Sequence, residues 1–430
     1  MIKVITYGTY DLLHYGHIRL LERAKQLGDY LIVGVTSDDF DKARGKINVQ
    51  QSLIERLEAV KNTGLADEII VEEYEGQKID DIKRLGVDIF TVGSDWAGKF
   101  DYLNEYCKVI YLDRTEGVSS SSLRASENNV RIGFIGDAES IEFHKYQTEC
   151  SFVNGAEIVG TCESNERQEY TNFILHCDAV YIASHPSFRY QQVKTALKAG
   201  KHVLCKSPLA MKLEECEELF DIAKHKHLVL MEAIKTAYST AYNRLLLLAK
   251  SGKIGRILSI DSTCTSLDVK TNSWNSIEMW APTAILPVLQ IFGTKYKDIQ
   301  YVCCKDGDFD AFNKINITFP QGVASIKVGM GFKSEGELII SGTKGYIYVP
   351  APWWKTDYFE LRFENPNENK RYFYQLDGEG IRFELVAFIR SIKSQKIISY
   401  IDESVTGKIA EIVENYSLGN GITYLETIKG

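Results

Sequence analysis

The sequence predicts an α/β chain with more than one parallel β-sheet. Its 430 residues are too many for one ordinary domain, and this length favours two or three. An apolar, β-branched run from Ile2 to Ile5 breaks at Gly8, and a helical pattern begins just after His17. From Val130 onward, strand-like runs again alternate with helical ones, which is the pattern of a parallel sheet with helices on both faces.

Composition excludes several classes of protein. Hydrophobic residues make up 44% of the chain, yet no apolar run approaches the ~20 residues of a membrane-spanning helix. Met1 to Lys3 lead directly into a strand, so we expect no signal peptide and no membrane insertion. Nine scattered cysteines predict neither a disulfide framework nor a zinc site, and they favour the cytoplasm. The net charge of −8 argues against nucleic acid as a partner.

The first element is a strand that runs into a glycine-bearing loop, Gly8 to His17. A loop between a strand and a helix brings backbone N–H groups and a helix N-terminus together, which favours phosphate. The imidazoles of His14 and His17 can reach one bound anion there. The helix that follows has apolar residues at helical spacing: Ile18, Leu20, Leu21, Ala24 and Leu27.

Two motifs in this first part resemble those of one enzyme family. The tetrapeptide His14 to His17 resembles the HxGH motif of nucleotidyltransferases, and the run Arg114 to Ser121 resembles the RTxGISTT motif of cytidylyltransferases. Val118 stands where that family has isoleucine, and Ser120 and Ser121 stand where it has threonine. Serine for threonine keeps the hydroxyl group and its hydrogen-bonding capacity.

Three further segments, 43–46, 93–100 and 113–114, follow the order and spacing of glycerol-3-phosphate cytidylyltransferases. The resemblance runs from Ile2 to about Leu123 and implies a Rossmann-like nucleotidyltransferase domain over residues 1–125. It implies transfer of CMP from CTP to a small polyol phosphate, with glycerol 3-phosphate as the expected acceptor. Ribitol phosphate and other short polyol phosphates remain possible acceptors. It also implies Mg²⁺ with the CTP, at least a dimer, and a part in bacterial cell-surface polysaccharide biosynthesis.

The side chains of these motifs suit attack on the α-phosphate of CTP, which needs positioning and charge neutralisation more than covalent chemistry. The catalytic candidates are His14, His17, Lys46 and Arg114. The resemblance also implies a set of nucleotide-binding residues: Thr9, Tyr10, Asp11, Gly16, Gly93, Asp95, Arg114, Thr115, Ser119, Ser120 and Ser121. Asp11 is the expected metal ligand.

A short polar linker, residues 126–129, separates this domain from the next part of the chain. Four strands are then expected, at 130–136, 157–162, 178–183 and 201–205. Because helical patterns separate them, they predict a second Rossmann-like domain.

Two segments of this second part match one family. Residues 199–210 follow the AGKHVLCEKPLA segment, and residues 251–257 follow the SGKIGxI segment, of the Gfo/Idh/MocA oxidoreductases, which this part of the chain therefore resembles. Alternating runs at 316–319 and 324–328 fit that family's open, mainly antiparallel sheet. The resemblance implies a dinucleotide-binding-like Rossmann domain at 130–250 and an α+β sheet domain at 251–430.

The glycine-rich turn of that family has changed in this sequence. Gly136 remains, but the next glycine position holds Ala138, between Asp137 and Glu139. Those two carboxylates would repel a pyrophosphate. Glu163 ends the second strand, where an acidic residue would bind ribose hydroxyls.

The hydride-transfer positions have also changed. Ser207 replaces the lysine of the family's EKP triplet, and Met279 and Thr283 stand at positions of the DxGxH or DxGxY motif. Neither Met279 nor Thr283 can act as a general acid at neutral pH. Four nearby groups could substitute for the lost residues: Lys206, Glu278, Lys235 and Tyr238.

Three interpretations of the second part therefore stay open. It is an oxidoreductase-like module of doubtful redox activity, an NAD(P)-dependent oxidoreductase within a bifunctional enzyme, or a binding or oligomerisation element. Gly136, Glu163 and Lys206 are the candidate dinucleotide-binding residues.

Overall fold

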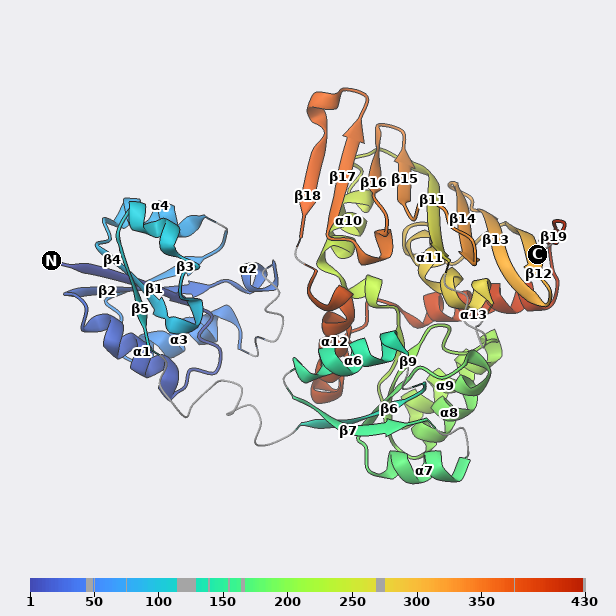
Figure 1. Cartoon of the computed structure of the whole chain (residues 1–430), viewed down its shortest axis with the longest axis horizontal. Helices are drawn as coiled ribbons and strands as arrows, with labels where there is room; N and C mark the ends of the chain where they lie inside the picture. Colours follow the sequence, from blue (N-terminus) through green and yellow to red (C-terminus); the bar gives the residue numbers. More distant parts are fainter. Residues whose placement is uncertain are drawn as a thin grey trace. The chain divides into compact units, whose positions relative to one another are not determined.

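The computed structural model describes residues 1–43, 49, 51–74, 76–113, 129–137, 140–153, 155–163, 167–267, 275–374 and 376–427. The chain divides into two compact units, Met1–Asn129 and Val130–Gly430 (Figure 1). Within the described ranges, no helix is both long enough and apolar enough to cross a membrane.

The first unit contains a five-stranded parallel sheet with the order β3-β2-β1-β4-β5. Its strands are β1 (Lys3–Gly8), β2 (Tyr30–Thr36), β3 (Glu68–Glu72), β4 (Ile89–Gly93) and β5 (Lys108–Leu112). Its helices are α1 (Tyr15–Lys25), α2 (Asp38–Ala43), α3 (Leu53–Asn62), α4 (Gln77–Leu85), and the 3₁₀ turns η1 (Ser94–Trp96) and η2 (Asp101–Glu105). The strand order reverses between β1 and β4, so the loops after these two strands border a crevice at the carboxyl edge of the sheet.

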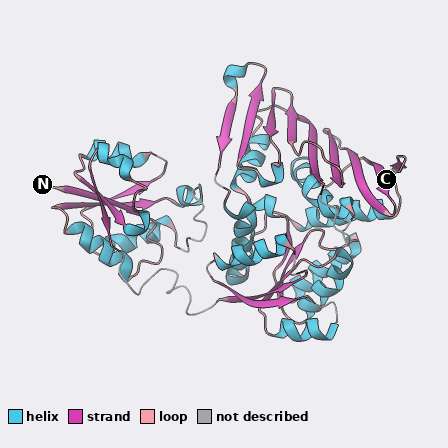
Figure 2. Cartoon of the chain, viewed as in Figure 1, coloured by secondary structure: helices cyan, strands magenta, loops and turns pink. Residues whose placement is uncertain are grey.

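Helices cover both faces of this sheet (Figures 1 and 2). Val4 of β1 packs in one cluster with Leu21 of α1, whereas the next residue, Ile5, packs in another with Ile82 of α4. Successive residues of a strand point to opposite faces, so β1 is buried on both sides. This explains why its sequence is a continuous apolar run.

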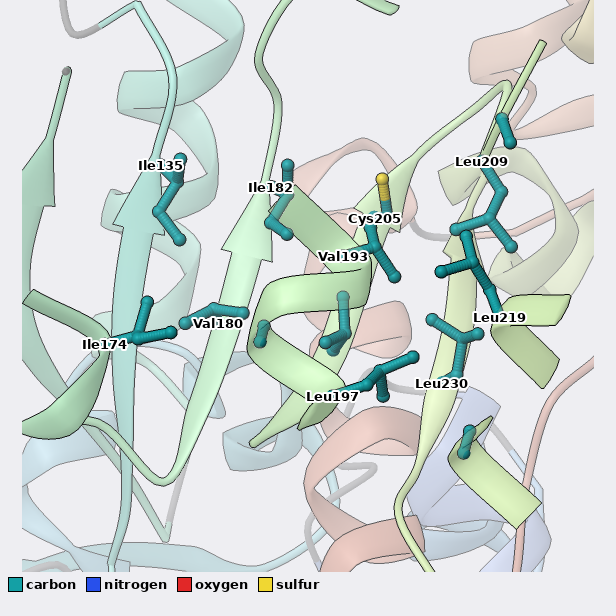
Figure 3. Close-up of a cluster of buried hydrophobic side chains, with 14 of the residues drawn as sticks. Ile135, Ile174, Val180, Ile182, Val193, Leu197, Cys205, Leu209, Leu219 and Leu230 are labelled. Carbon is teal, nitrogen blue, oxygen red and sulfur yellow. The ribbon is translucent and has the colours of Figure 1, made fainter. Parts of the chain in front are cut away.

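The second unit begins with another parallel sheet, of order β10-β9-β8-β6-β7. Its strands are β6 (Val130–Ile135), β7 (Ala156–Cys162), β8 (Ala179–Ile182), β9 (His202–Lys206) and β10 (Leu230–Ala233). Its helices are α6 (Ile141–Ser151), α7 (Arg167–Leu175), α8 (Pro186–Lys198) and α9 (Leu213–His225). Figure 3 shows its apolar core, where Val180 and Ile182 of β8 lie among residues such as Val193 of α8 and Leu219 of α9.

A nine-stranded sheet completes the unit, in the order β18-β17-β16-β15-β11-β14-β13-β12-β19. Its strands are β11 (Ile257–Ser266), β12 (Asp298–Asp306), β13 (Phe309–Thr318), β14 (Val323–Met330), β15 (Leu338–Gly342), β16 (Gly345–Val349), β17 (Tyr358–Phe363), β18 (Lys370–Phe373) and β19 (Ile422–Tyr424). The pairs β11–β14 and β12–β19 are parallel and the others are antiparallel, so the mainly antiparallel sheet predicted from the sequence is present, with two parallel pairings.

The remaining helices of this unit precede, follow or interrupt the strands of the nine-stranded sheet. They are η3 (Lys235–Tyr238), α10 (Thr240–Lys250), α11 (Ser276–Phe292), η4 (Trp353–Lys355), η5 (Pro366–Glu368), η6 (Asp377–Gly380), α12 (Ile381–Ser394) and α13 (Glu403–Ser417). Ala410 of α13 belongs to the apolar core of the parallel sheet, and the Tyr146 hydroxyl of α6 donates to Glu384 of α12 at 2.6 Å. The C-terminal helices thus return to the parallel sheet, and a division of this unit at residue 250 stays a proposal.

Candidate functional site

The two histidines predicted to be catalytic lie side by side at the start of α1. Their ring centroids are 3.9 Å apart, with 24° between the ring planes. His14 is the N-cap of α1, and its Nδ1 accepts the backbone N–H of Gly16 at 3.1 Å. Since Nδ1 is an acceptor, Nε2 of a neutral His14 carries the proton and can donate. Both rings therefore lie at a helix N-terminus beyond the carboxyl end of β1, where an anion is favoured.

The loop before these histidines has a strained backbone. Tyr10 and Leu12 have φ angles of +54° and +47°, in the left-handed region that residues with side chains seldom adopt. The Tyr10 side chain lies in the core of the first unit, 1% exposed, and burial raises its pKa. Of the predicted nucleotide-binding residues, Tyr10 can therefore present only its backbone to a ligand.

The side chain of Arg56 in α3 holds this loop in place through a hydrogen bond to its backbone. Its side chain is fully buried, and Nη1 donates to the carbonyl oxygens of Thr9 at 2.7 Å and Thr36 at 2.8 Å. The guanidinium also forms ion pairs with Asp38 and, at 3.6 Å, with Asp41. A buried guanidinium is stable only when hydrogen bonds and counter-charges replace its lost water. The Arg56 side chain thus links the loop after β1 to the end of β2.

A second set of contacts positions Asp11, the predicted metal ligand. Its Oδ1 accepts the backbone N–H of Gln51 at 2.9 Å, and the Gln51 side-chain oxygen accepts the N–H of Leu12 at 2.8 Å. The hydroxyl of Thr9 donates to Asp41 Oδ1 at 2.9 Å. Among the residues that the structure describes, no group of three or more His, Cys, Asp or Glu side chains is arranged to hold a metal.

Gly93 and Asp95 lie on the other side of the strand reversal. Gly93 ends β4, and Asp95 follows in η1 with an exposed side chain. The pairing of Thr6 with Thr91, extended by two residues, brings Gly8 and Gly93 to the same level of neighbouring strands. The structure therefore brings the histidine loop and the Gly93 loop together at one edge of the sheet.

Several predicted residues lie outside the described part of the chain: Lys46, Arg114, Thr115, Ser119, Ser120 and Ser121. The last described residue before the second motif is Asp113, whose carbonyl oxygen accepts a hydrogen bond from Nη1 of Arg23 at 2.7 Å.

Sequence reasoning missed Arg56 and Gln51. The signal that could have located them is the capping box at the start of α3, where Ser52 and Glu55 each accept the other's backbone N–H. Arg56 is the residue directly after Glu55, and it lies in a helix that has an apolar face. Its partners are far away in the sequence, so their identity required the fold.

In the second unit, the turn after β6 requires glycine at position 136. Gly136 has φ +147°, and a Cβ there would lie 3.1 Å from the carbonyl carbon of Ala183. Ala138 and Glu139 lie outside the described residues, and Glu163 is exposed just after β7.

Lys206 and Glu142 form an ion pair at the carboxyl edge of this second sheet. Lys206 is the last residue of β9, and Glu142 lies in the first turn of α6. Burial lowers the pKa of Lys206, although Glu142 opposes this; burial would raise the pKa of Glu142, but Lys206 brings it below its usual value. A carboxylate in the first turn of this helix places negative charge at the end of the helix where the fold binds a dinucleotide pyrophosphate.

Ser207, at the family's lysine position, is buried and donates through its hydroxyl to Glu232 at 2.5 Å. Met279 and Thr283 lie in α11, and neither side chain carries a group that exchanges protons near neutral pH. Among the candidate substitutes, the Tyr238 hydroxyl is buried 3.1 Å from Ser399, and burial raises its pKa. Lys235 is paired with Glu379 at 2.7 Å.

Two family models match this chain. The cytidylyltransferase-like model matches residues 5–159, and the model of the oxidoreductase family with an NAD-binding Rossmann fold matches residues 129–234. The glycerol-3-phosphate cytidylyltransferase of Bacillus spizizenii is 51% identical over 124 residues, which are 29% of this chain and 95% of that protein. The enzyme of the same name from Staphylococcus aureus is 47% identical over 124 residues, which are 29% of this chain and 93% of that protein.

Solved structures resemble the second unit. The 3-ketoreductase KijD10 of Actinomadura kijaniata, in complex with NADP and TDP-benzene, has a TM-score of 0.61 and 17% identity, and the match covers 69% of this chain and 100% of that one. UDP-N-acetylglucosamine 3-dehydrogenase GnnA of Acidithiobacillus ferrooxidans has a TM-score of 0.57 and 15% identity, covering 68% and 98%. At these identities the likeness establishes the fold alone.

We expect Arg56→Met to destabilise the first unit by about 3–5 kcal/mol, because it removes the buried guanidinium that bonds the carbonyl oxygens of Thr9 and Thr36 and lies beside the buried Asp41 carboxylate. Urea denaturation at neutral pH measures this loss. Arg84→Met is the matched control: Arg84 pairs with Asp81 at 2.7 Å, but the Arg84 side chain is 60% exposed and Asp81 keeps its hydrogen bonds from Tyr7 and Gln77, so the loss should cost at most about 1 kcal/mol. Equal effects of the two substitutions would contradict the role assigned to Arg56.

Proposed function

Since the chain belongs to the cytidylyltransferase family through its first domain and carries an oxidoreductase-family module after it, we propose that the first unit transfers CMP from CTP to glycerol 3-phosphate. The observation that supports this most strongly is the stacked pair His14 and His17 at the N-terminus of α1. It occurs within a region 51% identical to an enzyme whose name gives that reaction.

In the proposed reaction, a phosphate oxygen of glycerol 3-phosphate attacks the α-phosphorus of CTP. A bond forms between them, the bond between the α-phosphorus and the bridging oxygen breaks, and pyrophosphate leaves. Negative charge builds up on the α-phosphate oxygens and on the leaving oxygen. His14 and His17 donate hydrogen bonds to this centre, and the N-terminus of α1 adds its partial positive charge. Because Gly16 engages Nδ1 of His14, Nε2 is the atom that faces the phosphate.

The remaining roles follow from the family resemblance. Lys46 and Arg114 neutralise the triphosphate, with Thr115, Ser119, Ser120 and Ser121 donating to its oxygens. Gly93 and Asp95 hold the base and ribose from the loop after β4, and the backbone of Thr9 and Tyr10 faces the triphosphate. Asp11 is suited to Mg²⁺, because its carboxylate is fixed by Gln51 beside the histidine loop. The ion, when bound with CTP, neutralises phosphate charge.

We also propose that the chain assembles at least as a dimer through its first domain. Its CDP-linked product feeds the synthesis of a cell-surface polymer. Another short polyol phosphate, such as ribitol phosphate, is the alternative acceptor.

We expect His17→Ala to reduce CMP transfer about 10²–10³-fold, because it removes one preorganised donor to the transition state. Pyrophosphate release with CTP and glycerol 3-phosphate measures the rate, and circular dichroism shows whether the fold is intact. The control is His176→Ala, an exposed histidine of the second unit, which should leave the rate unchanged. A His17→Ala enzyme with half of the parent rate would overturn the catalytic role.

For the second unit we propose that it performs no hydride transfer. That reaction needs a group to take up or deliver the hydroxyl proton. Ser207, bound to Glu232, and the α11 residues Met279 and Thr283 occupy the family's positions for that group. A dinucleotide also fits poorly, because Glu142 places a carboxylate at the N-terminus of α6.

Three observations favour the alternative, in which the second unit is an active NAD(P)-dependent oxidoreductase. Gly136 keeps a positive φ at the position of the family's first turn glycine, Lys206 lies at the carboxyl edge of the sheet, and the structural relative KijD10 was solved with NADP.

The full chain should therefore show no turnover with NAD(H) or NADP(H) on a panel of polyols, polyol phosphates and keto-sugar phosphates. Absorbance at the nicotinamide band measures turnover, and calorimetry measures cofactor binding. Tight cofactor binding with steady turnover would replace this proposal by the bifunctional one, with Lys206, Glu278, Lys235 or Tyr238 as the proton-transferring group.

A further inference from the structure

Three lysines from separate elements of the second unit converge on one carboxylate. The ammonium nitrogens of Lys145 in α6, Lys235 in η3 and Lys355 in η4 lie 2.8, 2.7 and 3.0 Å from oxygens of Glu379 in η6. We call these four residues the lysine cluster. One carboxylate balances only one of three ammonium groups, so the cluster keeps a surplus of two positive charges.

The backbone around Glu379 has three consecutive residues with positive φ angles. Glu379 has φ +54° and lies between Gly378 at +63° and Gly380 at +90°. A left-handed residue with a side chain costs about 1–2 kcal/mol. A Cβ at position 380 would lie 2.5 Å from the backbone oxygen of Lys235, so the close approach of η6 to η3 requires glycine.

The electrostatics of the cluster favour a bound anion. Burial would raise the pKa of Glu379, but Lys145, Lys235 and Lys355 bring it to about 2, so the carboxylate is ionised at neutral pH. Lys206 pairs with Ala233 at the end of β10, just before Lys235, and its ion pair with Glu142 carries no net charge, so it leaves this surplus unchanged.

The cluster lies where parallel sheets receive ligands. Lys235 follows the end of β10 at Ala233, and Lys206 ends the neighbouring strand β9. Ligands of α/β sheets bind beyond the carboxyl ends of the strands. The side chains of Lys145, Lys355 and Glu379 are 41%, 35% and 26% exposed, so a dissolved ion can reach them.

We propose that the lysine cluster is a phosphate-binding site, which takes the phosphate group of a small polyol or sugar phosphate and in which Glu379 is the internal counter-ion. Lysine binds phosphate as a point charge, and the two charges of a phosphate monoester match the surplus. If the cluster only held four elements together, its surplus positive charges would repel one another and weaken that contact. The proposal goes beyond cytidylyl transfer and does not depend on it.

Two substitutions in the full chain test the proposal in opposite directions. Lys355→Met keeps the apolar stem and removes one charge, so it should weaken phosphate binding about fivefold. Glu379→Gln removes the competing anion, so it should tighten phosphate binding by a similar factor of about five. Calorimetry with inorganic phosphate and with glycerol 3-phosphate measures both effects. Any phosphate bound by the first unit is common to all variants and cancels in the comparison.

Glu411→Gln is the matched control, because Glu411 also pairs with a lysine, Lys408, in α13 of the same unit but neutralises no surplus. It should leave phosphate binding unchanged. If Lys355→Met and Glu379→Gln lower the melting temperature while phosphate affinity stays constant, the cluster is only structural and the proposal fails. If NADP⁺ binding responds to Lys355→Met while both small phosphates do not, the occupant is a dinucleotide and the proposal also fails. If Glu379→Gln does not fold, Lys355→Met alone decides.

Discussion

The buried guanidinium of Arg56 is the interaction on which the histidine site depends. A cation removed from water must satisfy its N–H groups and balance its charge inside the protein. Arg56 does so with the carbonyl oxygens of Thr9 and Thr36 and with two aspartates, and thereby joins the loop after β1 to the end of β2. That loop contains the strained residues Tyr10 and Leu12 and leads directly into α1. This anchoring fixes the start of the loop that leads to the two imidazoles.

Sequence patterns predicted the parts of the structure that depend on local order. Apolar runs located β1 of the first parallel sheet and β6, β7, β8 and β9 of the second. The other strands of the first sheet followed only from the family resemblance, and β10 was not predicted. The spacing of His14 and His17 predicted that both rings reach one point, and they stack. The contacts of Arg56 and of the lysine cluster could not be predicted, because the partners come from distant segments: Glu379 is 234 positions from Lys145. Contacts of that range become visible only when the fold brings the elements together.

The second unit has kept the fold of an oxidoreductase while its polar groups make other contacts. Ser207 is bound to Glu232, and Lys206 is bound to Glu142 at the N-terminus of α6. Gly136 still has a positive φ that requires glycine after β6. Positive charge has instead accumulated around Glu379. This arrangement favours a module that binds a phosphorylated ligand over one that transfers hydride.

The most direct test of the account is pyrophosphate release by the full chain with Mg²⁺, glycerol 3-phosphate and each of the four nucleoside triphosphates in turn. The account predicts release that depends on the acceptor and is at least about tenfold faster with CTP than with ATP, GTP or UTP, a difference of about 1.4 kcal/mol. Faster release with ATP, or release that does not depend on a polyol phosphate, would contradict it.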